Sequence, residues 1–197
     1  MKRAGLSALL REHGFAGGAS TFRKLVGKTT VFVVNVQRST SGGSYINLGV
    51  HLKHLGKSHW PDVEEHQCAF RTRLQDFAGG ERFFFDDESS VLALCEMWKL
   101  EGVRWFERFE PEQLATTVKQ VAKHGDAAPD TWARVAKKLG DAASEKRLIA
   151  RGKKLERERK TAREAELAAT VMMTMAEYRA AKKAGTLKRG ISIQIVG

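Results

Sequence analysis

The side chains best suited to chemistry in this sequence are amides and arginines that alternate with apolar residues. Successive side chains of a strand point to opposite faces, so the apolar residues of each segment share one face and the polar residues share the other. With the apolar faces aligned on one core, the opposite face gathers Asn35, Gln37, Tyr45, Asn47, His51, Arg71 and Arg73. Amides donate and accept hydrogen bonds, and a guanidinium group binds carboxylate or phosphate in a bidentate fork. This face is either a binding site for an anion or nucleic acid, or the polar outer side of a half-solvated antiparallel sheet.

Histidines and carboxylates raise two questions of metal chemistry. Zinc accepts His and Cys ligands, and five such residues lie within 18 positions: His51, His54, His59, His66 and Cys68. Their spacing fits no compact zinc motif. A nuclease could use the acidic run at residues 86–88 to hold Mg²⁺, but acidic residues at the positive end of a helix explain the same run without chemistry. We expect no metal and no cofactor, and the sequence indicates no catalytic residue.

The charge of the chain is concentrated toward its C-terminus. The formal net charge is +11; residues 144–197 hold 14 Lys and Arg against 6 Asp and Glu, and residues 1–143 hold 20 against 17, which gives +8 and +3. A polyanion is expected to contact the first part of this region, through Arg147, Arg151, Lys154, Arg157 and Lys160. Three interpretations stay open: a solvated charged helix, a helix that binds the backbone of DNA or RNA, and a helix that binds a protein partner.

Several classes of protein are excluded by what the sequence lacks. No apolar run approaches the roughly 18 residues that span a bilayer, so we expect no membrane segment. No Walker A loop, GxGxxG, HExxH or GxSxG motif is present. Cys68 and Cys95 lie in apolar patterns without CxxC spacing, which favours buried free thiols in a reducing cytoplasm.

The N-terminal part predicts a helix followed by an antiparallel sheet. Leucines at helical spacing indicate a helix over residues 3–13. Residues 16–20 are expected to form a loop. The β-branched segments predict a three-stranded meander, at residues 21–26, 29–37 and 45–52. Residues 68–74 fit a fourth strand better than a helix, with Cys68, Phe70 and Leu74 on the apolar face, and residues 82–85 predict a short edge strand.

The pattern becomes helical from residue 89 onward. Helices are expected over residues 89–100, 111–122 and 130–139, and Gly102 and Gly140 are expected to end the first and the third. The segment 103–109 is a separate amphipathic piece. Residues 144–184 lack proline and are rich in Ala, Glu, Lys and Arg, so they predict one helix that includes a methionine-rich patch at 171–175. A final strand is expected at residues 191–196. This patch and this strand are candidate contacts in a homo- or hetero-oligomer.

The order and spacing of several N-terminal segments resemble a bacterial family, domain of unknown function 4304. The segments are His13-Gly14-Phe15, Thr21-Phe22-Arg23, and residues 34–39 (VNVQRS), 46–50 (INLGV) and 68–74 (CAFRTRL). The resemblance covers roughly residues 6–110. It implies a small α+β domain with an antiparallel sheet and no established reaction. The basic region after residue 140 lies outside it.

These observations combine into one prediction of architecture and function. The fold class is α+β, with an antiparallel sheet of four to five strands and flanking helices in residues 1–143, followed by a basic helical extension in residues 144–197. We expect a non-enzymatic binding subunit of the bacterial cytoplasm that contacts nucleic acid or an acidic protein, in a defence or mobile-element system. The alternatives are an enzyme that processes nucleic acid or nucleotides on the polar sheet face, and a structural assembly subunit.

Overall fold

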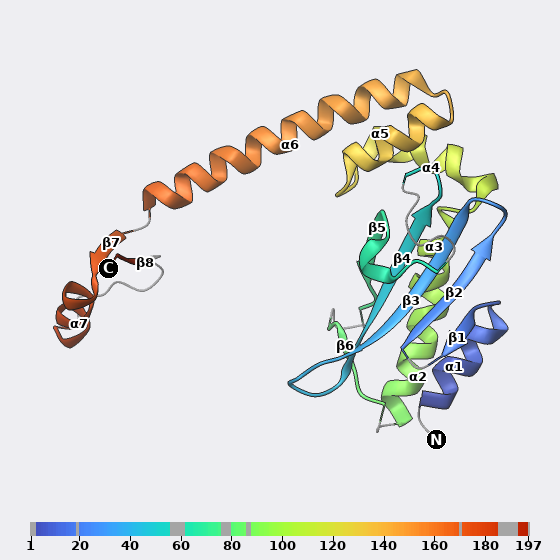
Figure 1. The fold of residues 1–197 in the computed structure, drawn as a ribbon, viewed down its shortest axis with the longest axis horizontal. Coiled ribbons are helices and arrows are strands. Elements are labelled where there is room, and N and C mark those ends of the chain that lie inside the picture. The colour runs from blue at the N-terminus through green and yellow to red at the C-terminus, as the bar shows by residue number, and fades with distance from the viewer. Residues whose placement is uncertain are drawn as a thin grey trace. The chain divides into compact units, whose positions relative to one another are not determined.

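The computed structural model of the chain describes residues 3–18, 20–55, 62–75, 80–85, 88–169, 171–184 and 193–196. The chain divides into two compact units, Met1–Ile149 and Ala150–Gly197. The first unit holds a six-stranded antiparallel sheet with helices, and the second holds most of a long helix and a two-stranded sheet (Figure 1). The α+β fold class predicted from the sequence is confirmed.

The larger sheet is built around a meander of three long strands. Its strand order is β1-β2-β3-β4-β5, and β6 pairs with β4 beyond the end of β5. The strands span, in chain order, Ala16–Gly18, Thr21–Val26, Thr30–Arg38, Ser44–Leu52, Phe70–Arg73 and Arg82–Phe83. The predicted meander is therefore confirmed as β2, β3 and β4, and residues 70–73 form a strand as expected.

The first strand of the sheet was not expected, because its residues read as a loop. Ala16–Gly18 (β1) pairs with β2 in antiparallel register, Gly17 opposite Phe22. Gly17 has a φ of +119°, and a Cβ at this position would lie 2.5 Å from the Thr21 carbonyl oxygen. Only glycine can adopt this backbone at so close an approach, so the glycine that suggested a loop is what permits the strand.

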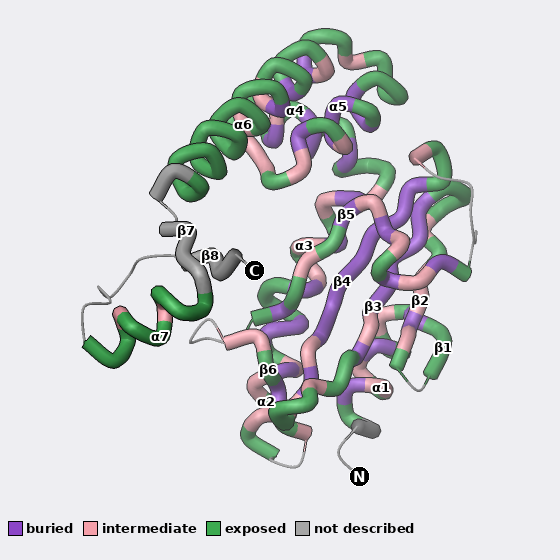
Figure 2. The backbone as a smooth tube through the Cα atoms, turned by 60° about the vertical axis from the view of Figure 1, so that its left-hand side comes forward, coloured by how far each residue is buried: buried purple, intermediate pink, exposed green. Residues whose placement is uncertain are grey.

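One face of the sheet carries the main core, and helices cover it. Phe32, Val34 and Val36 of β3 point to this face together with Ile46 and the other alternate residues of β4. The helices α1 (Arg3–Glu12), α2 (Glu88–Met97) and α3 (Val103–Glu107) lie behind the sheet in Figure 1. The buried colour of β3 and β4 in Figure 2 marks the centre of the unit.

The helix that starts at α2 does not end at Gly102, in contrast to the sequence prediction. It continues through a π-helical turn, η2 (Trp98–Gly102), directly into α3. Gly102 has helical torsions, and a Cβ there would lie 2.8 Å from the Trp98 ring. Glycine at this position thus makes room for a buried indole beside the backbone rather than ending the helix.

Three helices beyond α3 complete the core of the first unit. They are α4 (Pro111–His124), α5 (Pro129–Lys138) and the start of α6 (Ala142–Ala169). Trp132 of α5 is fully buried, with its ring stacked on Phe109 at 5.3 Å between centroids and 4.5 Å from Phe70. Leu148 of α6 is also fully buried in this core. Gly140, at a φ of +75°, ends the α5 segment as predicted.

The second unit differs from the single helix predicted over residues 144–184. Helix α6 ends at Ala169, and residues 171–174 form strand β7 (Val171–Thr174), which pairs in parallel with β8 (Ile193–Val196). The methionine-rich patch is therefore extended up to Thr174, and only Met175 begins the next helix, α7 (Met175–Lys183). A valine and a threonine flank the methionines, and β-branched residues favour strands once a partner strand is available. Residues 191 and 192 of the expected last strand lie outside the described residues.

The described helices include none that is both long and apolar enough to cross a membrane. Cys68 and Cys95 are both free, the first buried and the second half-buried.

Candidate functional site

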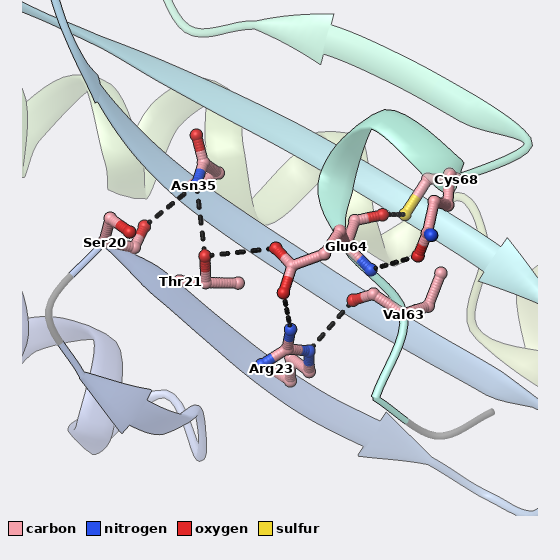
Figure 3. A network of polar contacts seen from close by, with 8 residues as sticks. Ser20, Thr21, Arg23, Asn35, Val63, Glu64 and Cys68 are labelled. Carbon is pink, nitrogen blue, oxygen red and sulfur yellow. Dashed lines mark hydrogen bonds and ion pairs between the residues drawn. The ribbon is translucent and has the colours of Figure 1, made fainter. Parts of the chain in front are cut away.

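A short segment covers part of the sheet face opposite the main core. Residues 62–68, which we call the strap, cross this face and include the turn η1 (Glu65–Gln67). Arg23 of β2 fixes the strap twice, because its Nε donates to the Val63 carbonyl oxygen at 2.9 Å and its Nη2 pairs with the Glu64 carboxylate. The Thr21 hydroxyl also donates to Glu64 (Figure 3). The predicted polar face is thus only partly open to solvent.

The strap has an apolar underside that forms a second small core. Val63 and Cys68 of the strap pack with Val31 and Val33 of β3. Gly49 of β4 permits this contact, because a Cβ there would lie 2.7 Å from the Cys68 Sγ atom. The prediction that Cys68 shares the main apolar face with Phe70 and Leu74 is therefore wrong. The strand begins only at residue 70, and η1 places Cys68 over the opposite face.

The Cys68 thiol is protected by the strap. Burial raises its pKa to about 12, and the neighbouring Glu65 carboxylate adds to this rise. The thiol is therefore protonated at neutral pH and is a poor nucleophile.

We expect Ellman's reagent to modify Cys68 at least 100-fold more slowly than Cys95 in the folded protein, since Cys68 must wait for the strap to open. In a Cys95→Ala background, the change Arg23→Ala removes both Arg23 anchors and is expected to accelerate Cys68 modification about tenfold. Modification rates follow from the absorbance of the released thiol. Equal rates for the two cysteines would contradict the protective role of the strap.

Two of the seven predicted face residues lie on the part of the face that the strap borders, one beside a buried carboxylate and one buried itself. Arg71 lies beside the strap, where its Nε donates to Glu65 Oε1 at 2.7 Å, and this hydrogen bond raises the pKa of Arg71. Glu65 is itself buried. His51 is buried on the same face, opposite Val31 of β3.

Four of the other five predicted residues join Thr21, which was not predicted, in a connected polar row that we call the polar ladder. It consists of Thr21, Asn35, Gln37, Asn47 and Arg73, one or two from each of four neighbouring strands. Asn47 lies at its centre, only 5% exposed, and its Nδ2 donates to Gln37 Oε1 at 3.1 Å and to Asn35 Oδ1 at 3.4 Å. Asn35 Nδ2 donates onward to the Thr21 hydroxyl at 3.1 Å.

Arg73 ends the polar ladder at the β5 side of the sheet. Its Nε donates to Asn47 Oδ1 at 3.1 Å, and its Nη1 pairs with Glu81 Oε2 at 2.8 Å. Its guanidinium carbon lies 4.5 Å from the centre of the Tyr45 ring, a cation–π geometry. Asn47 and Asn35 each accept from one neighbour and donate to the next, so the row is polarised from the Arg73 cation through the Thr21 hydroxyl to the Glu64 anion.

The chemistry of the polar ladder is hydrogen bonding rather than proton transfer. Amides do not titrate and a guanidinium group stays protonated, so these groups donate and accept hydrogen bonds but do not transfer protons at neutral pH. The nearby carboxylates Glu64, Glu65 and Glu81 each pair with an arginine.

The sequence did not indicate that the strap residues and Gly49 belong to this site. The alternation in β2 would have placed Thr21 and Arg23 on this face, but no periodicity marks the two glutamates.

The predicted metal-binding groups are only partly described. His54 is exposed as a whole residue, but its ring is partly buried. This partial burial and the nearby cations Lys138 and Arg134 lower the pKa of His54. Among the described residues, no three His, Cys, Asp or Glu side chains are grouped to hold a metal ion. His59, Asp86 and Asp87 lie outside the described residues. Of the other carboxylates, Glu88 begins α2.

The five cations predicted to contact a polyanion all lie on α6. Arg151 is half-buried, and Arg147, Lys154, Arg157 and Lys160 are exposed. Helical spacing divides them between two stripes. Arg147, Arg151 and Lys154 share one stripe with Glu158, which lies 3.8 Å from the Lys154 ammonium group. Arg157 and Lys160 lie on another stripe, which also carries Lys146 and Lys153 and ends at Glu164.

Comparisons with known proteins address the first unit. No curated protein and no solved structure matches the chain. Residues 6–108, a little over half of the chain, match a family described as "Domain of unknown function (DUF4304)". The matched residues span α1 to α3 and contain the sheet, the strap and the polar ladder, and they exclude α4, α5 and α6. On this match over its sheet and first helices, the chain belongs to the DUF4304 family.

Proposed function

We propose that this protein binds nucleic acid without catalysis, through the cations of α6. The observation that carries the proposal is the stripe of four exposed cations along one face of the helix, Lys146, Lys153, Arg157 and Lys160. Glu156 borders this face, four residues before Lys160, and Glu164 ends it.

The spacing of the stripe suits a linear polyanion. Lys153, Arg157 and Lys160 are four and three residues apart, which is about 6 Å and 4.5 Å along the helix axis. Cations at such intervals can neutralise successive phosphates of one strand and release condensed counterions. A protein partner would instead require an apolar centre in the contact. Ile149 and Leu167 are large apolar side chains that α6 exposes, and neither lies among Lys153, Arg157 and Lys160.

Three arginines of the sheet are less available to phosphate than the cations of α6. Arg23, Arg71 and Arg73 each have a carboxylate partner at 3.0 Å or closer. In α6, Lys160 lies 3.9 Å from the Glu164 carboxylate, and both side chains are more than half exposed. An ion pair this open to solvent is worth little and yields readily to a phosphate.

The test is the affinity of the full-length protein for a fluorescent 20-base-pair DNA and a 20-nucleotide RNA, measured by anisotropy over a range of salt concentrations. In the triple variant Lys153→Glu, Arg157→Glu, Lys160→Glu, we expect affinity for at least one of these to fall at least tenfold. The slope of log affinity against log salt should fall by about 3, one for each lost phosphate contact.

A matched control reverses three exposed cations of the first unit: Arg11→Glu, Lys28→Glu and Arg38→Glu. It has the same net charge as the α6 variant and is expected to keep its affinity within about threefold. If both variants lost affinity equally, net charge alone would explain the effect, and this result would overturn the proposal. If the protein bound polyglutamate more tightly than DNA and RNA, the partner of α6 would be an acidic protein, and this result would also overturn the proposal.

A further inference from the structure

We propose that an extended peptide binds at the outer edge of β5 and in the cleft beside it. The peptide adds to the sheet as a further strand, and its side chains alternate acidic, apolar and acidic. This inference is independent of the nucleic-acid binding assigned to α6. Three features carry it, namely the unpaired backbone of the strand, a cleft beneath its end and the two arginines along it.

The backbone of β5 offers hydrogen bonds away from the sheet. β5 is the last strand in the order β1-β2-β3-β4-β5, and no described strand pairs with its outer side. The Leu74 N–H donates to the Ile46 carbonyl oxygen of β4 at 2.9 Å. Because an antiparallel ladder alternates, Thr72 also bonds to β4, and the N–H and C=O groups of Arg71 and Arg73 point outward. Such a row is a template for another strand.

A cleft of about 510 Å³ opens between the end of β5 and the α2–α3 helix. Leu48, Leu74 and Met97 form its apolar floor, and all three are buried, whereas Gln75, Glu101 and Arg73 line its polar rim. Trp105 forms a half-buried wall, and its ring packs 5.1 Å from both Phe106 and Phe109. Thr72 points to the same side of the sheet as this floor. A peptide residue paired with Thr72 would therefore place its side chain at the cleft, which suits an apolar group.

The charges along the edge select the flanking residues of the peptide. Arg71 and Arg73 alternate with Thr72 along β5, and their side chains are 52% and 44% exposed. Arg73 also lines the cleft at its rim. A strand added to β5 places its own side chains beside these two arginines. Arg73 uses Nε and Nη1 with Asn47 and Glu81, so its Nη2 stays available to a carboxylate among the described contacts. Acidic residues are therefore favoured on both sides of the apolar one.

The same charges disfavour a second copy of this chain as the occupant. Two β5 edges that meet about a two-fold axis at Thr72 would place Arg71 of one copy directly opposite Arg73 of the other. Like charges in this position repel. The edge is thus complementary to an acidic segment and resists pairing with itself.

The probe for the test is the fluorescein-labelled peptide Gly-Thr-Glu-Leu-Glu-Thr-Gly, titrated with the full-length protein and followed by anisotropy. We expect saturable binding below about 1 mM. Affinity should fall at least tenfold when the two Glu become Lys, when Leu becomes Ser, or when the Leu amide is N-methylated. No saturable binding at 1 mM, or equal binding of the Lys peptide, would overturn the proposal.

Two variants of one residue separate the backbone from the side chain. Arg71→Ala removes the guanidinium group and keeps the outward N–H, whereas Arg71→Pro removes both and leaves the bonds to β4 intact. We expect the proline variant to bind the peptide at least tenfold more weakly than the alanine variant, with thermal unfolding confirming that both are folded. Equal affinities would overturn strand addition. A wild-type dimer in sedimentation that the proline variant abolishes would assign the edge to a second copy and also overturn it.

Discussion

Replacing Trp132 with alanine is expected to lower the free energy of unfolding of the first unit by about 3–5 kcal/mol. The indole is fully buried and contacts the rings of Phe70 in β5 and Phe109 after α3. Its removal leaves a cavity between α5 and the sheet that the surrounding rings cannot fill. Urea denaturation followed by far-UV circular dichroism measures the loss.

Trp105→Ala is the matched control, because Trp105 belongs to the same aromatic cluster but is half exposed. It is expected to lose less than half as much stability, since part of its ring already contacts water. A loss below about 1 kcal/mol for Trp132→Ala would show that α5 is not part of this core. The prediction also bears on the family match, which ends at residue 108 although the core continues to Leu148.

Gly49→Ala is the second large effect, with an expected destabilisation of about 1–3 kcal/mol. The new Cβ would lie 2.7 Å from Cys68 Sγ and 3.0 Å from its Cβ, so the strap must move away from the sheet. Movement of the strap would also strain the contacts that Arg23 makes with Val63 and Glu64. Urea denaturation again provides the measurement.

A double-mutant cycle identifies the cause of the Gly49 effect. In a Cys68→Ala background the shortest contact is gone, so Gly49→Ala is expected to cost at least about 0.5 kcal/mol less. Gly18→Ala is the control, because a Cβ at Gly18 meets no atom within 4 Å, and its effect should stay within about 0.5 kcal/mol. Additive losses at Gly49 and Cys68 would show that the two residues do not restrain each other.

The sheet could be predicted from the sequence because its signals are local. Alternation in β3 and β4 shows which residues share a face, and the observed register places Asn35 opposite Asn47 and Asn47 opposite Arg73. The polar ladder follows from this alternation alone. Its hydrogen bonds do not, because they depend on side-chain torsions and on Thr21 of β2.

The errors arose where a residue acts through a distant partner. From the sequence alone, Gly102 indicates a helix end. In the structure it lies within the helix, because only glycine leaves room for the Trp98 ring. Cys68 fits the alternation of β5 but belongs to the strap, whose position depends on Arg23, 45 residues earlier in the chain. Residues 171–174 continue a helical composition, yet they pair with a strand that begins at Ile193. Long-range contacts of this kind leave no periodic trace in a single sequence.

The short first strand has a consequence for how the protein is made. The ribosome delivers β1, β2, β3 and β4 in that order, and N-terminal parts begin to fold first. β1 is three residues long, and its central Gly17 approaches the Thr21 backbone too closely for a side chain. The nascent meander therefore emerges with the first half of β2, Thr21–Arg23, already paired with a segment that is a poor template for aggregation. Until β5 is synthesised, the β4 side of the unfinished sheet is the longer unpaired edge.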